Sequence, residues 1–294
     1  MAKTMLNTEQ RNPDTYDLDK LQTPELVMAI NRADQAVAMI VAGALDQIAA
    51  AVDGISARLK AGGRLFYVGS GTSGRLGVLD AVECPPTFGV PTELVQGVLS
   101  GGYGACHSAV ESAEDSPEQG EADLRARNLT SHDAVVGVAA SGQTPYTLGA
   151  VRYARGLGAL TVGVSCNRNA SLSKEVDLPI EVETGPEVLT GSTRMKAGTA
   201  QKMILNILST ATMVRLGHVY SNLMVNVHLK NQKLVERGVR IIRDVTGATE
   251  DKARQALERT GDVKSSIVML KLGCSADQAK KKASSLARLR EIIG

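Results

Sequence analysis

The stretch Leu65-Phe-Tyr-Val-Gly69-Ser-Gly-Thr-Ser-Gly-Arg-Leu-Gly77 decides the fold of this chain. Its first four residues are apolar on both faces, as in a strand buried on both sides, and a turn rich in glycine and hydroxyl groups follows them. Strands of this kind are typical of parallel sheets that helices cover on each side. The stretch therefore predicts a strand, then a loop at the carboxyl edge of a sheet, then a helix.

The same alternation continues along the middle of the chain. Short β-rich runs at residues 94–99, 134–138 and 160–164, with a weaker run at 178–182, are separated by turns and helical stretches. Strands that alternate with helices along the chain pair in parallel, because each helix carries the chain back across the sheet. We therefore expect an α/β fold with a parallel sheet flanked by helices.

Helical periodicity dominates both ends of the sequence. A helical pattern begins at Thr23, which has the character of a cap residue, and continues to Lys60. Near the other end, helical periodicity covers residues 198–216 and then the sequence from about Val225 onward. We expect three parts: an N-terminal helical segment (1–60), a sheet domain that binds the ligand (61–225) and a small C-terminal helical subdomain (226–294).

Composition excludes several classes of partner. The 294 residues carry 33 Lys and Arg against 31 Asp and Glu, so a formal charge of +2 creates no field that would draw the chain to nucleic acid or to an anionic membrane. Aromatic residues make up only 3% and Trp is missing, which disfavours stacking platforms for bases or sugars. Any affinity for a ligand must therefore be local.

Cysteine and histidine spacing predicts no metal site. The four Cys and four His residues are scattered, without a C-x-x-C pair or metal-ligand spacing. The polar start of the chain lacks a signal-peptide pattern, and the longest apolar run, residues 36–45, is half of the roughly 20 residues that a membrane span needs. We expect a cytoplasmic protein with reduced thiols, no bound metal and no membrane segment.

The loop after the first predicted strand matches the pattern G-x-G-x-x-G. A dinucleotide site also needs an acidic residue about 20 residues on, after the next strand, whereas Glu93 precedes that strand. The variable positions hold the hydroxyl residues Ser70, Thr72 and Ser73. Hydroxyls and amides at a helix N-terminus suit a phosphate monoester better than a pyrophosphate. The alternative is a glycine-rich turn with a structural role only.

The loop after the third predicted strand is built in a similar way. Ser141, Gln143 and Thr144 supply polar atoms at a helix start, where Gly142 permits an unusual backbone angle and Pro145 fits the first turn. Parallel strands end at one edge of a sheet, so we expect the two loops to converge on one anion. The alternative is that Ser141 or Thr144 is only a helix cap.

A third hydroxyl-rich and glycine-rich turn runs from Thr190 to Thr199. It contains Ser192 together with two cations, Arg194 and Lys196. The cations either neutralise a phosphate or an oxyanion, or they are solvated charges near a helix start, where the helix dipole disfavours them. The residues alone leave these two interpretations open.

These motifs resemble those of known families. The loops 69–77 and 141–144 resemble the phosphosugar-binding signature of SIS (sugar isomerase) domains. The segment from Glu83 to Thr87, the acidic segment 111–115 and the stretch 190–202 are similar to the N-acetylmuramic acid 6-phosphate etherase family, and the similarity runs almost end to end. The third stretch is also similar in the glucokinase regulatory protein, which binds sugar phosphates without turning them over.

The resemblance implies a reaction and a set of site residues. Members of the etherase family release D-lactate from C3 of the sugar by elimination, and water then adds to give N-acetylglucosamine 6-phosphate, with no cofactor. By this resemblance Glu83 is the proton donor to the leaving lactate, and Glu114 is the second essential carboxylate, plausible as the C2 base. Seven residues would hold the substrate: Ser70, Thr72, Ser73, Ser141, Gln143, Thr144 and Ser192. The family precedent also implies a homodimer that acts in cell-wall amino sugar recycling or catabolism.

The two glutamates also have simpler interpretations. Pro85 and Pro86 are expected to end the helix that holds Glu83, which would place its carboxylate on a stiff segment. Glu114 lies in an acidic cluster that would ordinarily be a solvated face. Three other functions stay open at this point: a non-catalytic sugar-phosphate-binding regulator, an aldose-ketose isomerase on the same fold, and a nucleotide-dependent dehydrogenase.

Overall fold

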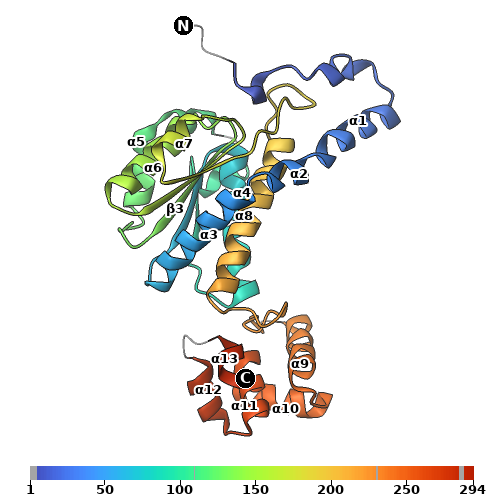
Figure 1. Cartoon of the computed structure of the whole chain (residues 1–294), viewed down its shortest axis with the longest axis vertical. Helices are drawn as coiled ribbons and strands as arrows, with labels where there is room; N and C mark the ends of the chain where they lie inside the picture. Colours follow the sequence, from blue (N-terminus) through green and yellow to red (C-terminus); the bar gives the residue numbers. More distant parts are fainter. Residues whose placement is uncertain (1–4, 109, 230, 285–287) are drawn as a thin grey trace. The chain divides into compact units, whose positions relative to one another are not determined.

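The computed structural model describes residues 5–108, 110–229, 231–284 and 288–294. The chain divides into two compact units. The first consists of Met1–Val82 and Glu93–Ser209, and the second consists of Glu83–Thr92 and Thr210–Gly294. Figure 1 shows the sheet with its helices in the first unit and a group of short helices in the second.

One parallel sheet forms the centre of the first unit. Its five strands have the order β2-β1-β3-β4-β5 and every neighbouring pair is parallel, which confirms the predicted α/β fold. The strands are β1 (Leu65–Gly69), β2 (Val95–Leu99), β3 (Ala134–Ala139), β4 (Leu160–Ser165) and β5 (Leu178–Glu181). All residues of β1 and β3 are buried, because helices cover both faces. The weak run lies at the sheet edge as β5, where Pro179 is tolerated.

Helices cover both faces of the sheet. On one face, Phe66 and Val68 of β1 pack in a core with Tyr146 and Leu172. On the other face, Tyr67 lies against Gly77, where a Cβ would come within 2.8 Å of the tyrosine Cβ, and its hydroxyl reaches the carbonyl of Leu205 at 3.5 Å. The first face is covered by α5 (Pro117–Arg125), α6 (Pro145–Gly156) and α7 (Ser171–Glu175), and the second by α3 (Leu45–Lys60), α4 (Gly71–Phe88) and α8 (Lys196–Arg215).

The N-terminal helical pattern is broken into three helices. These are α1 (Thr23–Gln35), α2 (Val37–Ala42) and α3, and the axis bends by 61° at Gly43 and Ala44. The expected continuous helix is therefore wrong, because glycine is a weak helix former and the chain turns there. The cap position is also wrong by one residue: Gln22 caps α1 in a capping box with Glu25.

The described residues contain no single helix with the length and apolar composition of a membrane span. Only the bent pair Thr23–Ala42 and Leu45–Lys60 meets those two criteria, and only when it is taken together.

The second unit contains a helical bundle with its own core. The core includes Val225, Ile242, Leu257, Ile267 and Leu289. Its helices are α9 (Gln232–Thr246), α10 (Glu250–Thr260), α11 (Val263–Leu272), α12 (Ala276–Ala283) and α13 (Leu289–Ile293). The predicted helical start near Val225 is wrong, because α9 begins only after Asn231, whose side chain caps it. The segment between α8 and α9 contains turns and an isolated bridge from Tyr220 to Leu223.

Candidate active site

Two hydroxyl-rich loops leave the sheet from neighbouring strands. Gly69 at the end of β1 pairs with Val138 near the end of β3, so the loops that begin at Ser70 and Ser141 start side by side at the carboxyl edge. A Cβ on Gly69 would come within 2.8 Å of the Val138 carbonyl oxygen, so this close approach requires glycine. The structure therefore brings together the two loops that the sequence predicted to converge.

The first loop leads into α4, and its two serine hydroxyls differ in whether they have a hydrogen-bond partner. Gly71 has a φ of +53°, in the left-handed region, and opens the helix. Ser70 is buried, and its Oγ has no hydrogen-bond partner among the described residues. The Ser73 hydroxyl, by contrast, donates to Gln201 Oε1 at 2.9 Å, so its only proton points toward α8. Ser70 can donate to a ligand directly, whereas Ser73 links two helices in this state.

The second loop leads into α6 without a side-chain cap. Thr144 stands at the N-cap position of α6, yet its side chain accepts no cap hydrogen bond. Ser141 Oγ accepts from the Gln143 N–H at 3.1 Å, and the three polar residues of the loop are half-buried. Gly142 has a φ of +66°, and a Cβ there would lie 2.4 Å from the Ala170 Cβ. Thr144 is thus not an ordinary cap, and its hydroxyl stays available at a helix N-terminus.

The third turn is closed by a carboxylate that the sequence analysis missed. Glu187 is fully buried and accepts hydrogen bonds from the backbone N–H of Lys196 at 3.0 Å and of Ala197 at 2.9 Å. The α8 N-terminus is therefore occupied by an anion from this chain itself. The only sequence signal is an apolar-flanked glutamate nine residues before a helix start, which is too weak to identify.

Lys196 and Arg194 have different environments. Lys196 is buried, and its ammonium donates to the Thr184 carbonyl at 2.7 Å, so the interpretation of Lys196 as a solvated charge is wrong. Arg194 is exposed, and Ser192 is half-buried with its N–H donating to the Leu189 carbonyl. The ammonium of Lys196 therefore holds the start of α8 to Thr184, whereas the guanidinium of Arg194 lies on the surface.

Thr72 connects the first loop to the start of α8. A Cβ on Gly198 would lie 3.6 Å from Thr72 Cγ2, so the two segments are in close contact. Together with the bond from Ser73 to Gln201, this contact places the Thr190–Thr199 turn beside the first loop. Three of the predicted ligand-binding segments thus share one edge of the sheet.

Glu114 lies against the first loop. Its Oε1 is 3.1 Å from the position that a Cβ on Gly71 would occupy, and the side chain is half-buried. It belongs to η5 (Glu111–Asp115), which is tied to the sheet because Ser100 Oγ donates to the Ala113 carbonyl at 2.6 Å. The solvated-face interpretation fits the exposed Asp115 but is wrong for Glu114.

Glu83 lies in the second unit, on an exposed face of α4. The expectation that Pro85 and Pro86 end this helix is wrong, because α4 continues to Phe88. Proline lacks an N–H but its fixed φ fits a helix, and the helix ends when Gly89, at a φ of +67°, donates its N–H to the Pro85 carbonyl. Glu114 belongs to the first unit.

Polar contacts of Asn167 and Thr8 at this edge were not predicted from the sequence. Asn167 follows β4, and its amide donates to Thr8 Oγ1 and to the Ala140 carbonyl, both at 3.0 Å. The buried Thr8 therefore fixes the N-terminal segment next to the second loop. Burial also raises the pKa of the Cys166 thiol to about 12, so this cysteine is unsuited to nucleophilic chemistry.

A buried carboxylate joins α4 to α8. Asp80 accepts hydrogen bonds from Asn206 Nδ2 at 2.6 Å and from Ser209 Oγ at 3.1 Å. Burial raises the pKa of Asp80, and the hydrogen bonds oppose that shift. Among the residues that the structure describes, no group of three His, Cys, Asp or Glu side chains is arranged to hold a metal ion.

Comparison with known proteins gives the family. Residues 47–155 match the model of the glucokinase regulatory protein N-terminal SIS domain, and residues 112–211 match the SIS domain model. A solved structure from Bacteroides fragilis, described as a phosphosugar isomerase involved in capsule formation, is similar with a TM-score of 0.51 and 22% identity, over 67% of this chain and 94% of that one. That likeness supports the fold.

Two relatives cover almost the whole chain. N-acetylmuramic acid 6-phosphate etherase of Mycolicibacterium smegmatis is 56% identical over 283 residues, which cover 96% of this chain and 95% of the relative. The enzyme of the same name from Pectobacterium atrosepticum is 53% identical over 278 residues, 94% of this chain and 92% of the relative. The chain therefore belongs to the N-acetylmuramic acid 6-phosphate etherase family, and its sheet domain is a SIS domain.

Proposed function

We propose that this protein is a carbon–oxygen lyase that cleaves the D-lactyl ether of N-acetylmuramic acid 6-phosphate. The products are N-acetylglucosamine 6-phosphate and D-lactate. The observation that carries the proposal is the contact of Glu114 with Gly71, because it holds a carboxylate against the loop that we propose binds the phosphate. Family membership supports the same substrate. A site of this kind would serve in the recycling or catabolism of cell-wall amino sugars.

The phosphate acts as the handle of the substrate. Ser70 and Thr144 offer hydroxyls that no described residue uses for capping or for another hydrogen bond, and the N-termini of α4 and α6 offer backbone N–H groups. Thr72, Ser141 and Gln143 would complete the contacts, with Ser192 on the phosphate or the sugar. Binding energy from this remote group would orient C2 and C3 for reaction.

The reaction itself needs one base and one acid. Once the sugar ring opens, the C1 aldehyde makes the C2 proton acidic, and a base removes it. The C3–O bond then breaks, an acid gives its proton to the departing lactate oxygen, and water adds at C3 of the unsaturated aldehyde. We assign Glu114 as the C2 base and activator of water, and Glu83 as the acid. Two carboxyl groups suffice when their environments separate their pKa values.

Release of D-lactate tests this assignment. The purified protein is incubated with N-acetylmuramic acid 6-phosphate, and D-lactate is measured enzymatically. Glu114→Gln should lower turnover by about 100-fold or more, the usual contribution of a positioned acid or base. Asp115→Asn, its exposed neighbour, is the matched control and should remain active. Sugar-phosphate binding without lactate release from folded wild-type protein would favour the non-catalytic regulator and contradict the proposal.

Proton exchange at C2 separates the roles of the two glutamates. In deuterated water, Glu83→Ala should still exchange the C2 proton while failing to release lactate. Glu114→Ala should lose exchange. The opposite pattern would reverse the two assignments, and proton transfer from C2 to C1 would instead indicate an aldose-ketose isomerase.

We also propose that the protein works as a homodimer in the cytoplasm. Helix α1 has no buried residue, and Val27, Met28 and Met39 are 58%, 57% and 76% exposed, so an apolar surface is available for a second copy. None of the four cysteines forms a disulfide, which fits a reducing compartment. Sedimentation should give a dimer mass for wild-type protein and a monomer mass for Met28→Glu; an unchanged mass would place the contact elsewhere.

A further inference from the structure

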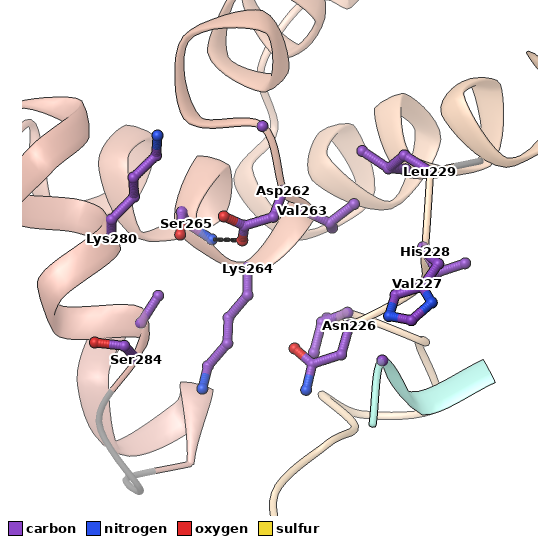
Figure 2. A pocket seen from close by; sticks show the side chains of 14 residues that line it. Asn226, Val227, His228, Leu229, Asp262, Val263, Lys264, Ser265, Lys280 and Ser284 are labelled. Atoms are coloured by element: carbon purple, nitrogen blue, oxygen red, sulfur yellow. Dashed lines mark hydrogen bonds between the residues drawn. The ribbon is translucent and has the colours of Figure 1, made fainter. Parts of the chain in front are cut away.

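The second unit contains a cavity of about 520 Å³ (Figure 2). This volume lies within the usual range for small-molecule sites, about 300–1,000 Å³. The cavity shares no residue with the hydroxyl-rich loops of the first unit. Its walls come from Gly89, the segment 225–229, the segment 261–265 with the first turn of α11, and Lys280, Ala283 and Ser284 at the end of α12.

The lining of this cavity favours an anion. Lys264, Lys280 and His228 are its basic residues, and Asp262 is the one acid among its described residues. Asp262 Oδ1 accepts the backbone N–H of Ser265 at 2.7 Å, the dashed line in Figure 2, so it caps α11. The acid is thus engaged by the backbone, and the lysines are left to a ligand.

Lys264 is the residue on which the inference depends. It is half-buried, and its ammonium makes no hydrogen bond or ion pair with any residue that the structure describes. Burial lowers the pKa of Lys264, while the nearby Asp262 opposes that change. A partly desolvated ammonium without a partner is unfavourable, and a bound anion would supply the missing hydrogen bonds.

Asn226 adds a polar amide to the lining of the cavity. Figure 2 shows the Asn226 amide and the Lys264 ammonium extending in the same direction, while Lys280 extends away from Lys264. Asn226 Nδ2 is 2.9 Å from His218 Nδ1, which fixes the amide. The cavity lining therefore combines the ammonium of Lys264, the fixed amide of Asn226 and the charge of Lys280 on α12.

We propose that this cavity binds a small phosphorylated sugar or polyol at a second site, with its phosphate on Lys264. Lysine binds phosphate as a compact point charge, whereas planar carboxylates favour the fork of arginine. The described lining contains no Phe, Tyr or Trp, so a nucleotide base would find no stacking surface. The remaining volume, lined by polar and small aliphatic groups, fits a body of a few hydroxylated carbons.

Calorimetry with the full chain tests the second site. The probes are N-acetylglucosamine 6-phosphate, inorganic phosphate and uncharged N-acetylglucosamine, titrated into the Ser141→Ala variant so that the first-unit loops contribute less. The phosphorylated sugar should bind, and Lys264→Met should weaken it about tenfold or more, the effect of one charge-assisted hydrogen bond. Lys271→Met, an exposed lysine on the same helix, is the matched control and should leave the affinity unchanged.

Two further measurements keep the test decisive. The imidazole NMR signals of His228 and His218 should move when the phosphorylated sugar is added, and should not move in Lys264→Met. Lys264→Arg, which keeps the charge, should retain binding even if Lys264→Met folds poorly. Equal affinity in Lys264→Met and wild type, or binding in which the uncharged sugar matches the phosphorylated one, would overturn the proposal. The outcome is independent of lactate release.

Discussion

The helices of the second unit begin differently from the two helices α4 and α6 at the carboxyl edge of the sheet. In the second unit, α9, α10, α11 and α12 each start at a residue whose side chain accepts a backbone N–H: Asn231, Thr249, Asp262 and Ser275. At the carboxyl edge of the sheet, α4 and α6 start beside Ser70 and Thr144, whose hydroxyls make no cap hydrogen bond. A helix that caps itself spends its terminal N–H groups on stability, whereas an uncapped helix keeps them for an anionic ligand.

Helix α8 is the informative exception at that edge. Its N-terminus is capped by Glu187, which is distant enough in sequence to escape pattern analysis. The first amides of α8 are therefore occupied, so a ligand at this turn would meet side chains such as Ser192. We therefore expect three changes of helix caps to affect stability and lactate release to different degrees. These changes are a cap added to α6, a cap removed from α8 and a cap removed from α12.

The largest effect is expected from closing the open helix. Thr144→Asp places a carboxylate at the N-cap of α6, which should stabilise the fold by up to about 1 kcal/mol. The same charge should repel the substrate phosphate and lower kcat/KM for lactate release by about 100-fold or more. Thr249→Asp at the capped α10 is the control and should keep full activity. A Thr144→Asp protein with normal kcat/KM would show that the α6 terminus does not meet the phosphate.

Gly142→Ala should destabilise the first unit by about 1–3 kcal/mol. The added Cβ would lie 2.4 Å from the Ala170 Cβ, on a residue with a φ of +66°. Urea unfolding measures the loss. Gly156→Ala, at the end of α6 where a Cβ meets nothing within 4 Å, should cost little or stabilise the chain. Equal stability of the two variants would mean that the second loop can relax.

Glu187→Gln should cost about 1–2 kcal/mol, because a neutral amide gives up the charge at the α8 terminus and one of two acceptors. Lactate release should fall less than in Thr144→Asp, since Glu187 bonds the α8 terminus and lies outside the two hydroxyl-rich loops. Thermal unfolding and kcat/KM are measured together, with the exposed Glu118→Gln as the control. A stability like that of wild type would argue against a structural role for the buried carboxylate.

Ser275→Ala should cost about 1 kcal/mol in the second unit and leave activity unchanged. It removes the capping box that Ser275 forms with Gln278. Hydrogen exchange of the α12 amides reports the local loss. Reduced lactate release in this variant would show that the helical bundle contributes to turnover.

The smallest effect concerns pH. Burial lowers the pKa of His218, with a further contribution from the charge of Lys264, so folding favours the neutral form of this imidazole. The unfolded chain binds a proton near its ordinary pKa of about 6.5, so this contribution to stability is present above that pH and is lost as pH falls below it. His218→Gln should flatten the dependence of the urea midpoint between about pH 5 and 7. If the urea midpoint of His218→Gln depends on pH as steeply as that of wild type, groups other than His218 cause the dependence.

The strands were predictable because each one is a local signal. A short run that is apolar on both faces, such as Leu65–Val68, indicates a buried strand of a parallel sheet. All five expected strands are present. The position of the two loops at one edge follows from parallel pairing alone. Helix interruptions were less predictable: the break at Gly43 and the continuation through Pro85 and Pro86 depend on packing around them.

The sequence by itself determined the α/β sheet, the two hydroxyl-rich loops and, through resemblance, the family; it also predicted two catalytic glutamates. Tertiary structure decided which polar groups are free. Glu187 occupies the α8 terminus from outside that helix, Ser73 donates to Gln201 on a distant helix, and Glu114 lies against Gly71 of another loop. Periodicity and capping are encoded within a few residues, whereas the partner of a buried polar group is set by the whole fold.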